Sequence, residues 1–465
     1  MLLGNEYGQF ISRLCWPDLP TEVQEKTLDL VTDWMANTVA GFDSEIGQAL
    51  SALDQAQNGK SSGETHSIVL GNLKKTHPLQ AALINGGACH ALEFDDTYRS
   101  GLYHPGAPVI SAAWAAAGAT PVSGRRFLSA VAAGYEISMR LADAVNPGHN
   151  ATWHTTGTVG TFGAAAGAAH CMGLDPGKSA GALGLAGTQA AGLWEILPGF
   201  AQAKGLHTGK AAQSGLLAAL LANQGVLGPF SIFEGPRGFF KAMAPERICR
   251  KTCCAGLGEE WRLTRTTLKA YPVCGHTMTA IEAALNLAHD DVDPKTIKTI
   301  EVRAHPVSVG IAGNPAPESA LEAKFSIAFC VAVALVKKRV TLSDFSSDIL
   351  SDPTVLSVLP KITLVRDDGL NRINGQRPAK VSIRFTDNRI RSKTAHTRKG
   401  DPENPLTRLE IKNKFMELVR GTWGTEPGES VFNAVRLLPL YDDFNTWIKD
   451  HILIWQRDKS KHTTE

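Results

Sequence analysis

The residue types able to do chemistry occur in a few short polar segments, each set among small apolar residues. The first segment spans residues 90–98 (HALEFDDTY), and His104 follows shortly after it. Its carboxylates, Glu93, Asp95 and Asp96, together with a histidine, suit proton transfer or one side of a substrate cradle. The alternative is a helix-end cap, in which Asp95 or Asp96 accepts hydrogen bonds from backbone N–H groups.

The second segment, residues 150–160 (NATWHTTGTVG), places hydroxyl groups and glycines directly before a helix-forming run. A helix N-terminus offers backbone N–H donors and a positive dipole end, which suits a carboxylate near Thr155 and Thr156. His154 lies beside it as a candidate acid or base. The alternative for His154 is a core histidine whose hydrogen bonds are satisfied.

Two further segments complete the set of candidates. In residues 204–210 (KGLHTGK), Lys204 can hold a carboxylate as a point charge or, with its pKa lowered by burial, transfer protons. A solvated helix end is the alternative there. Residues 271–277 (YPVCGHT), which include His276, lie at the expected junction of two domains, where ligand sites often form.

Formal motif matches point to no other chemistry. Residues 177–181 match G-x-S-x-G, but a turn and not a strand precedes them, which argues against a serine hydrolase. The same stretch misses the phosphate-binding P-loop pattern, and no G-x-G-x-x-G occurs in this glycine-rich stretch. Cys249, Cys253, Cys254 and Cys274 contain no C-x-x-C pair, so we expect ordinary thiols and no metal.

Composition excludes several classes of protein. The 465 residues carry a net charge of only +2, which disfavours a general nucleic-acid binder. The first residues lack a signal-peptide pattern, and eight scattered cysteines are typical of a reducing compartment. The long charge-free stretch, residues 144–174, contains histidines, threonines and a proline, which are costly in lipid. We therefore expect a cytoplasmic protein without membrane segments, with a mitochondrial or other organellar location left open.

The elements that must position these segments follow from hydrophobic periodicity. Residues 78–228 are rich in Ala, Gly and Leu, which predicts a compact helical bundle. Alternating patterns predict strands at 297–305, 358–365 and 378–385, and residues 277–289 and 323–337 read as helices. The sequence thus predicts a mainly α protein with an all-helical domain, 1–267 plus 403–465, and a smaller α+β domain, 268–402.

Histidines, a lysine, carboxylates and a helix-terminus anion site together suit cofactor-free acid–base chemistry on a small anion, including carbanion chemistry next to a carboxylate. Four ordered motifs also resemble the MmgE/PrpD superfamily: HALEFDDT followed by HP, W-H-x-T-x-x-x-G-x-F-G-A-A-A-x-A-A, K-x-L-H-x-G-x-A-A, and Y-P-x-C. The superfamily includes 2-methylcitrate dehydratase, cis-aconitate decarboxylase and iminodisuccinate epimerase. The resemblance spans nearly the whole chain and implies the two-domain fold, a homodimer and no required cofactor.

By motif, the superfamily's pocket residues fall on Glu93, Thr97, His104, His154, Lys204 and His207. The predicted catalytic residues are Glu93, His104, His154 and Lys204; the predicted substrate-binding residues are Asp96, Thr97, Thr155, Thr156, His207 and His276. This chain departs from the family pattern at three positions. Glu93 stands where members usually have Asp, Met278 where a histidine is common, and Phe329 where related decarboxylases carry Tyr. Whether His276 replaces the histidine is left open.

The resemblance favours a hydro-lyase acting on a 2-methylcitrate-like polycarboxylate. In this hypothesis, His154 or His104 removes a proton, and Lys204, His207 and the backbone of Thr155–Gly157 hold carboxylates. The alternatives are a cis-aconitate decarboxylase-like carboxy-lyase and an epimerase of a dicarboxylic acid. A further alternative is an inactive binding or scaffold protein, which the three departures together would favour.

Overall fold

The computed structural model describes residues 1–57, 66–196, 203–244, 248–290, 292–370 and 376–455. The chain forms two compact units, Met1–Thr266 with Thr407–Glu465, and Thr267–Leu406. The sequence placed these boundaries at 267/268 and 402/403. The first unit therefore takes both ends of the chain, and the second is inserted between them.

The first unit is built from helices and one short hairpin. The helices are α1 (Leu3–Arg13), α2 (Thr21–Gly41), α3 (Glu45–Gln57), α4 (Pro78–His90), α5 (Gly106–Ala119), α6 (Gly124–Val145), α7 (Thr155–Cys171), α8 (Pro176–Gly187), α10 (Lys204–Asn223), α11 (Phe239–Met243), α12 (Arg250–Cys254), α19 (Arg408–Trp423), α20 (Thr425–Ala434) and α21 (Phe444–Ile448). The hairpin pairs β1 (Ser67–Ile68) with β2 (Lys75–Thr76) in antiparallel fashion.

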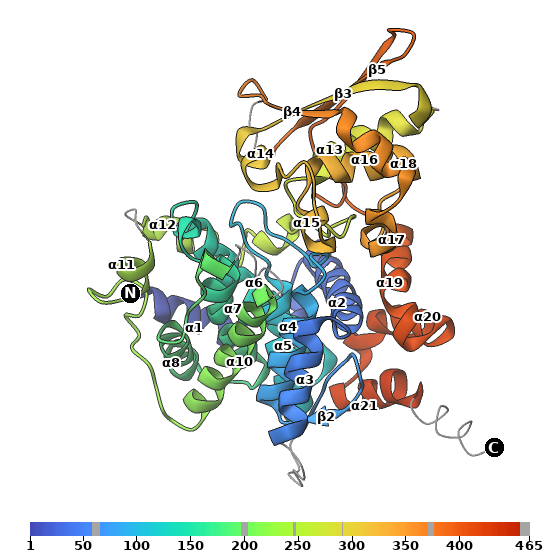
Figure 1. Ribbon diagram of the computed structural model, residues 1–465. Helices are drawn as coiled ribbons and strands as arrows, with labels where there is room; N and C mark the ends of the chain where they lie inside the picture. The colour runs from blue at the N-terminus through green and yellow to red at the C-terminus, as the bar shows by residue number, and fades with distance from the viewer. Residues whose placement is uncertain (58–65, 197–202, 245–247, 291, 371–375, 456–465) are drawn as a thin grey trace, which may run out of the picture. The chain divides into compact units, whose positions relative to one another are not determined.

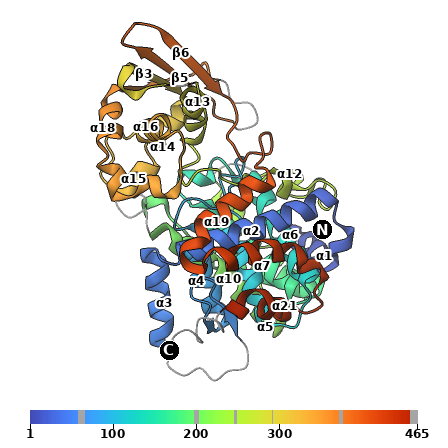
Figure 2. The ribbon, with the colours of Figure 1, turned by 90° about the vertical axis from the view of Figure 1, so that its right-hand side faces the viewer.

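Small residues let the central helices of this unit approach closely. Helix α10 packs against α4 and α7, and α7 packs against α5 and α6 (Figures 1 and 2). A Cβ atom on Gly209 of α10 would lie 2.3 Å from the carbonyl oxygen of Leu83 in α4. One on Gly215 would lie 2.4 Å from Cβ of Ala164 in α7. The Ala- and Gly-rich composition thus sets the helix spacing that brings three chain segments to one place.

The second unit contains a four-stranded sheet in the order β4-β3-β5-β6. Strand β3 (Ile297–Ala304) runs parallel to β4 (Ile362–Arg366) and antiparallel to β5 (Ala379–Phe385), which pairs with β6 (Ile390–Ala395). Helices α13 (Met278–Ala288) and α16 (Ile327–Lys337) pack together and against the sheet, and their apolar side chains share one core with its strands. The shorter helices are α14 (Pro306–Ala312), α15 (Ala320–Lys324), α17 (Ser347–Leu350) and α18 (Pro353–Val358).

The predicted fold class, mainly α with a smaller α+β unit, is confirmed. One strand prediction needs correction, and one strand was not predicted. The predicted strand at 358–365 begins only at Ile362, because Pro360 has no N–H for a sheet and lies in the helical turn Leu359–Lys361. Strand β6 was missed because it is an edge strand with five of its six residues exposed, so its sequence lacks an apolar alternation. Among the described helices, none is long and apolar enough to cross a membrane.

Candidate active site

The candidate site begins at the C-terminal end of α4, where His90 is the last helical residue. Three residues later Glu93 adopts a left-handed backbone conformation, with φ 57°. This is uncommon for a residue other than glycine and persists only where the surroundings hold it. The chain then pairs Tyr98 with Tyr103 in an isolated antiparallel bridge. This short return brings His104 back beside the residues that follow Glu93.

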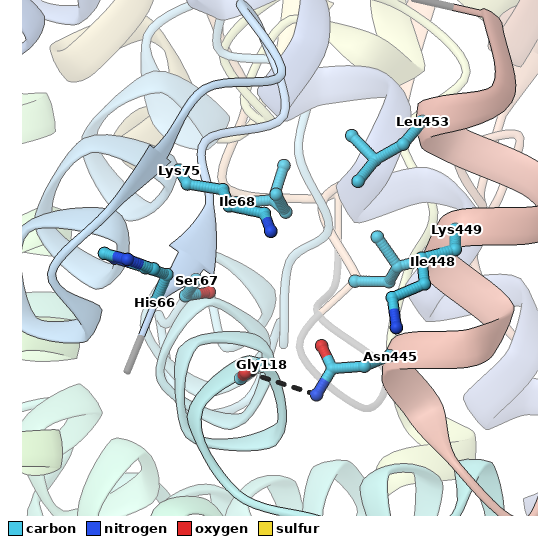
Figure 3. A pocket seen from close by; sticks show the side chains of 9 residues that line it. All are labelled: His66, Ser67, Ile68, Lys75, Gly118, Asn445, Ile448, Lys449 and Leu453. Carbon is cyan, nitrogen blue, oxygen red and sulfur yellow. Dashed lines mark hydrogen bonds between the residues drawn. The ribbon is translucent and has the colours of Figure 1, made fainter. Parts of the chain in front are cut away.

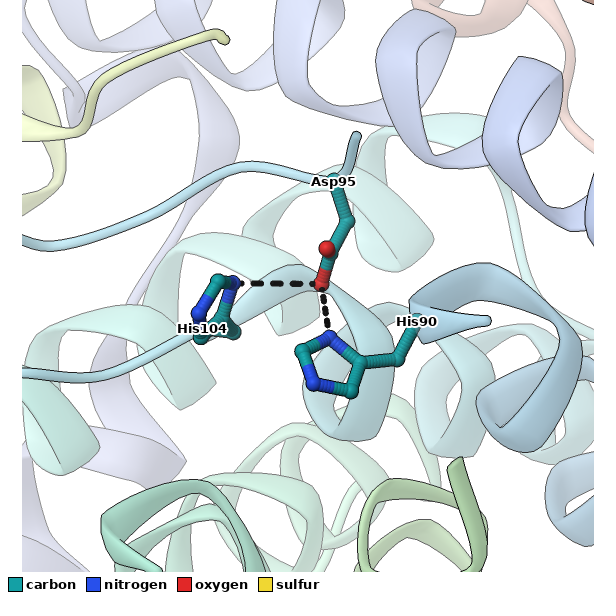
Figure 4. A group of neighbouring side chains, drawn as sticks. All are labelled: His90, Asp95 and His104. Carbon is teal, nitrogen blue, oxygen red and sulfur yellow. Dashed lines mark hydrogen bonds and ion pairs between the residues drawn. The ribbon is translucent and has the colours of Figure 1, made fainter. Parts of the chain in front are cut away.

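Asp95 is the centre of a carboxylate–histidine cluster (Figure 4). Its Oδ2 atom lies 2.7 Å from Nδ1 of His90 and 3.4 Å from Nδ1 of His104. Burial by itself would raise the pKa of Asp95, but the two imidazoles hold that pKa well below its usual range. Asp95 is therefore ionised at neutral pH, and each histidine faces a fixed negative charge.

The hydrogen bonds of the two rings decide which nitrogen carries the proton. Nδ1 of His104 also lies 2.9 Å from the backbone carbonyl oxygen of Asp96, which can only accept. Nδ1 therefore donates in both rings, and in the neutral rings Nε2 carries the lone pair. Nε2 of His90 is buried and has no hydrogen-bond partner among the described residues. A carboxylate that orients a histidine in this way prepares its other nitrogen to accept a proton.

A buried ion pair lies next to this cluster. The Nζ atom of Lys204 is 2.6 Å from Oε1 of Glu93, and their side chains are only 8% and 7% exposed. Lys204 is the first residue of α10, so its charge adds to the positive end of a 20-residue helix. The same Glu93 oxygen lies 3.9 Å from Nε2 of His90. The histidines therefore face the positive charge of Lys204 and of the α10 N-terminus, which the Glu93 carboxylate partly neutralises.

Two neutral histidines form a second pair. His154, directly before α7, and His207, in α10, place their Nδ1 atoms 3.1 Å apart. Burial first, and then the charge of Lys204 among other neighbours, holds the pKa of His154 well below its usual value. Burial, together with His90 and Lys204, also lowers the pKa of His207. Because both rings are neutral, one Nδ1 donates and the other accepts, and each ring keeps Nε2 for another partner.

The two histidine groups are parts of one site. The ring centroid of His90 lies 4.6 Å from that of His104 and 5.8 Å from that of His154. Nε2 of His154 is buried and has no hydrogen-bond partner within the described part of the chain. The half-buried ring of Trp194 packs 4.4 Å from the ring of His154, between centroids, and 5.9 Å from Nζ of Lys204. The end of α4, the residue before α7 and the start of α10 thus meet around two imidazole nitrogens that lack hydrogen-bond partners among the described residues.

The structure places the other predicted residues as follows. Asp96 accepts hydrogen bonds from the Gly106 N–H (3.0 Å) and the Tyr135 hydroxyl (2.8 Å), which is the capping alternative considered for this segment. Thr156 Oγ1 accepts from the backbone N–H of His104 at 3.2 Å. Thr97 and Thr155 are buried.

His276 belongs to the second unit. Its Nδ1 atom lies 3.3 Å from Ser308 Oγ, and its Nε2 atom lies 3.3 Å from Nη1 of Arg377. Met278 and Phe329, the other two positions expected to depart from the family pattern, are buried in the core of this unit. Each departure at these two positions is thus an apolar side chain packed among apolar neighbours.

Sequence reasoning named His90 and Asp95 within the first segment but did not select them as site residues. Both hold the centre of the cluster. Their spacing of five residues across a helix end was the available signal, because a residue just past a helix can fold back on the last turn. Trp194 was missed altogether, since an isolated tryptophan in a sequence is more often a packing residue.

A second buried ion pair contacts the backbone of the segment that carries the site carboxylates. Lys414 of α19 places Nζ 2.6 Å from Oδ1 of Asp33 in α2 and donates a hydrogen bond of 2.7 Å to the backbone carbonyl of Phe94. Phe94 lies between Glu93 and Asp95 in sequence. Helix α19 therefore holds the backbone segment between Glu93 and Asp95 in place.

The ligand atoms of His90, Asp95 and His104 lie within 4.8 Å of one another, close enough to hold a metal ion. The hydrogen bonds between these same atoms already account for their proximity. The absence of a metal stays a prediction. Chemically, the site offers a carboxylate-oriented imidazole, a neutral imidazole pair and a cation at a helix N-terminus, which are the groups needed to move protons on a small anion.

Fold and site together define a class: a two-unit, mainly helical protein whose helical unit carries a buried carboxylate–histidine–lysine cluster. The chain belongs to the MmgE/PrpD family, because the MmgE/PrpD N-terminal domain matches residues 5–250 and the MmgE/PrpD C-terminal domain matches residues 271–438. It is 27% identical to the cis-aconitate decarboxylase-like protein oryM of Aspergillus oryzae, over 92% of this chain and 93% of that protein.

Two further relatives carry more specific names. The chain is 27% identical to a cis-aconitate decarboxylase of Aspergillus terreus, with 89% of this chain and 88% of that protein covered. It is also 27% identical to a 2-methylcitrate dehydratase of Cupriavidus necator, over 66% of each chain. These relatives are lyases of two kinds, and they support a lyase without separating the two.

Proposed function

We propose that this protein is a lyase that acts on a small polycarboxylate by acid–base chemistry of its own side chains, with decarboxylation as the first reaction to test. The observation that carries the proposal is the cluster itself: imidazoles oriented by Asp95 lie beside a neutral His154 and the cation of Lys204. The relatives matched over about nine tenths of the chain are cis-aconitate decarboxylases or resemble them, which supports the choice of reaction.

In the proposed decarboxylation, Lys204 and the N-terminus of α7 hold carboxylates of the substrate. The bond between a carbon and one carboxylate breaks, CO₂ leaves, and the electron pair spreads into the adjacent conjugated system. His104, whose imidazolium form is stabilised by the neighbouring Asp95 carboxylate, then delivers a proton to the carbon that carries the charge. Stabilisation of the developing charge by fixed cations and N–H donors is the term that typically dominates such reactions.

A hydro-lyase is the second candidate, and the presence of two separate histidine groups favours it. Dehydration needs a base for the C–H proton and an acid for the departing hydroxyl group, which leaves as water. The Asp95-bound His104 and the neutral His154 can divide these tasks. The sequence favoured this reaction, and one relative over two thirds of the chain is a 2-methylcitrate dehydratase.

The test is incubation of the purified full chain with cis-aconitate, 2-methylcitrate, citrate and iminodisuccinate. We expect CO₂ release and itaconate from cis-aconitate. Alkene absorbance from 2-methylcitrate or citrate without CO₂ would replace the decarboxylase with the hydro-lyase, and a change in optical rotation alone would indicate an epimerase. Loss of turnover in His154→Ala, with circular dichroism unchanged, is expected for any of these enzymes; no turnover in the wild-type protein would favour a scaffold. A homodimer is also proposed and can be checked by light scattering.

A further inference from the structure

A cavity lies in the helical unit, between the β1–β2 hairpin and the C-terminal helices (Figure 3). Its volume is about 230 Å³. The residues that line it are His66, Ser67, Ile68, Lys75, Gly118, Asn445, Ile448, Lys449 and Leu453. Lys449 and Leu453 belong to the π-helical turn Lys449–Leu453 that follows α21. Neither the sequence motifs nor the proposed lyase reaction uses any of these residues.

This cavity is separate from the candidate active site. Gly118 lies near the C-terminal end of α5, whereas Gly106, at its N-terminal end, donates its N–H to Asp96 beside the carboxylate–histidine cluster. At 1.5 Å per residue, a helix of 14 residues spans about 20 Å. The hairpin likewise precedes the N-terminal end of α4, because β2 ends at Thr76 and α4 begins at Pro78, whereas His90 of the cluster is the last residue of α4. The two sites thus lie at opposite ends of the same two helices.

The charged side chains that line the cavity are all positive. Lys75 comes from β2 and Lys449 from the turn after α21, and the lining contains no carboxylate. Within the described residues, neither lysine forms an ion pair, in contrast to Lys393 and Lys412, which pair with acidic neighbours. Two like charges that converge on one cavity repel each other, and an anion between them would relieve that repulsion.

His66, Ser67 and Asn445 are the other polar residues of the lining. The Oγ atom of Ser67 is buried and has no hydrogen-bond partner in the described part of the chain, and Ser67 is 1% exposed. A buried hydroxyl without a partner costs free energy that a ligand could recover. Asn445 donates a hydrogen bond of 3.3 Å to the carbonyl oxygen of Gly118 (Figure 3), so this carbonyl does not present an unpaired acceptor to an anion.

We propose that this cavity binds a compact oxyanion, phosphate or carboxylate, which accepts hydrogen bonds from Lys75, Lys449 and Ser67. The volume limits the ligand, because pockets for drug-sized molecules measure about 300–1,000 Å³. A nucleotide is therefore too large, whereas inorganic phosphate or a small carboxylic acid fits the chemistry. The anion would join the hairpin to the C-terminal segment, which are far apart in the sequence.

The test is isothermal titration calorimetry of the full chain at low ionic strength, with inorganic phosphate in one arm and citrate in the other. Lys75→Met and Lys449→Met are each expected to weaken one binding event by roughly three- to fivefold, the scale of one exposed charge. Ser67→Ala is expected to weaken it as well. The matched control is Lys74→Met, which removes the same charge from an exposed neighbour outside the lining.

The arms distinguish the sources of the anion, since binding of phosphate alone assigns a phosphate site and binding of citrate alone assigns a carboxylate site. Any anion bound at the candidate active site is common to all four variants and does not affect the comparison. Equal affinities in wild type, Lys75→Met and Lys449→Met, or an equal loss in Lys74→Met, would overturn the proposal. Turnover of the lyase reaction is not needed for this experiment, so the two proposals fail independently.

Discussion

Lys204 and Glu93 are separated by 111 residues in the sequence, yet their side chains form a buried ion pair of 2.6 Å. The pair joins the N-terminus of α10 to the strained turn that carries the site carboxylates. Glu93 therefore neutralises the cation that we propose binds a substrate carboxylate. Glu93 makes this contact from a backbone in the left-handed region.

Removing one partner of this pair should destabilise the protein more than removing both. Glu93→Gln leaves the buried Lys204 charge without its partner, which typically costs about 3–5 kcal/mol. The double variant Glu93→Gln/Lys204→Met removes both charges and should cost less than the sum of the single variants. Urea unfolding of the four proteins measures this coupling. Additive free energies of unfolding would mean that the two charges do not interact.

Asp95→Asn should reduce turnover while the fold is retained. The amide offers an N–H to His90 or His104 in place of a carboxylate, which changes the ring tautomer and removes the charge that stabilises an imidazolium. In a comparable triad this change costs about 10⁴-fold in kcat, and we expect a loss on the order of 10²–10⁴ here. Steady-state kinetics gives the value. A kcat within threefold of wild type would show that Asp95 does not orient the reacting histidine.

The acid limb of the pH–rate profile is expected below about pH 6.5, because burial lowers the pKa of both His154 and His207.

The free energy of unfolding should also decrease as the pH falls, because of the same two lowered pKa values. As pH falls below the unfolded histidine value of about 6.5, the unfolded chain takes up protons that the folded state refuses, so stability is lost. Urea unfolding at pH 7.5 and 5.5 should show a smaller loss for His154→Asn than for wild type. An equal loss would place the titration elsewhere.

Asp96→Asn separates capping from substrate binding. Burial, together with the charges of Asp95 and Asp33, raises the pKa of Asp96 to about 8. Between the unfolded value, about 4, and about 8, the folded state holds the extra proton, so this group makes the protein less stable as pH rises. Asn can still accept from the Gly106 N–H, so the variant should gain relative stability at pH 8 and keep turnover within tenfold. A turnover loss beyond that would assign Asp96 to the substrate.

Lys414→Met should lower kcat without a comparable change in KM, because Lys414 positions the Phe94 backbone and is not proposed to touch the substrate. The variant also leaves the buried Asp33 carboxylate without its partner. Adding Asp33→Asn should restore thermal stability in part and leave kcat low, since the hydrogen bond to Phe94 is still missing. If kcat recovers together with stability, Lys414 has only a structural role.

Much of the fold was predictable because it depends on local patterns. The Ala- and Gly-rich stretch predicted closely packed helices, and alternation predicted β3 and β5. Prediction failed where the local pattern and the tertiary setting disagree. Strand β6 carries exposed charged residues because only one of its edges is paired with another strand. The strand predicted from residue 358 begins only at Ile362, because Pro360 lies in a helical turn before it.

The sequence by itself determined the family, the helical framework and the four polar segments that hold the chemistry. Only the tertiary structure decided that His90 and Asp95 are central, that Asp96 caps α5, and that Lys204 is paired with Glu93. The reason is that a side chain's protonation and partner depend on atoms from other helices within a few ångströms. Burial, hydrogen-bond direction and neighbouring charge arise when α4, α7 and α10 pack, and no local pattern encodes them.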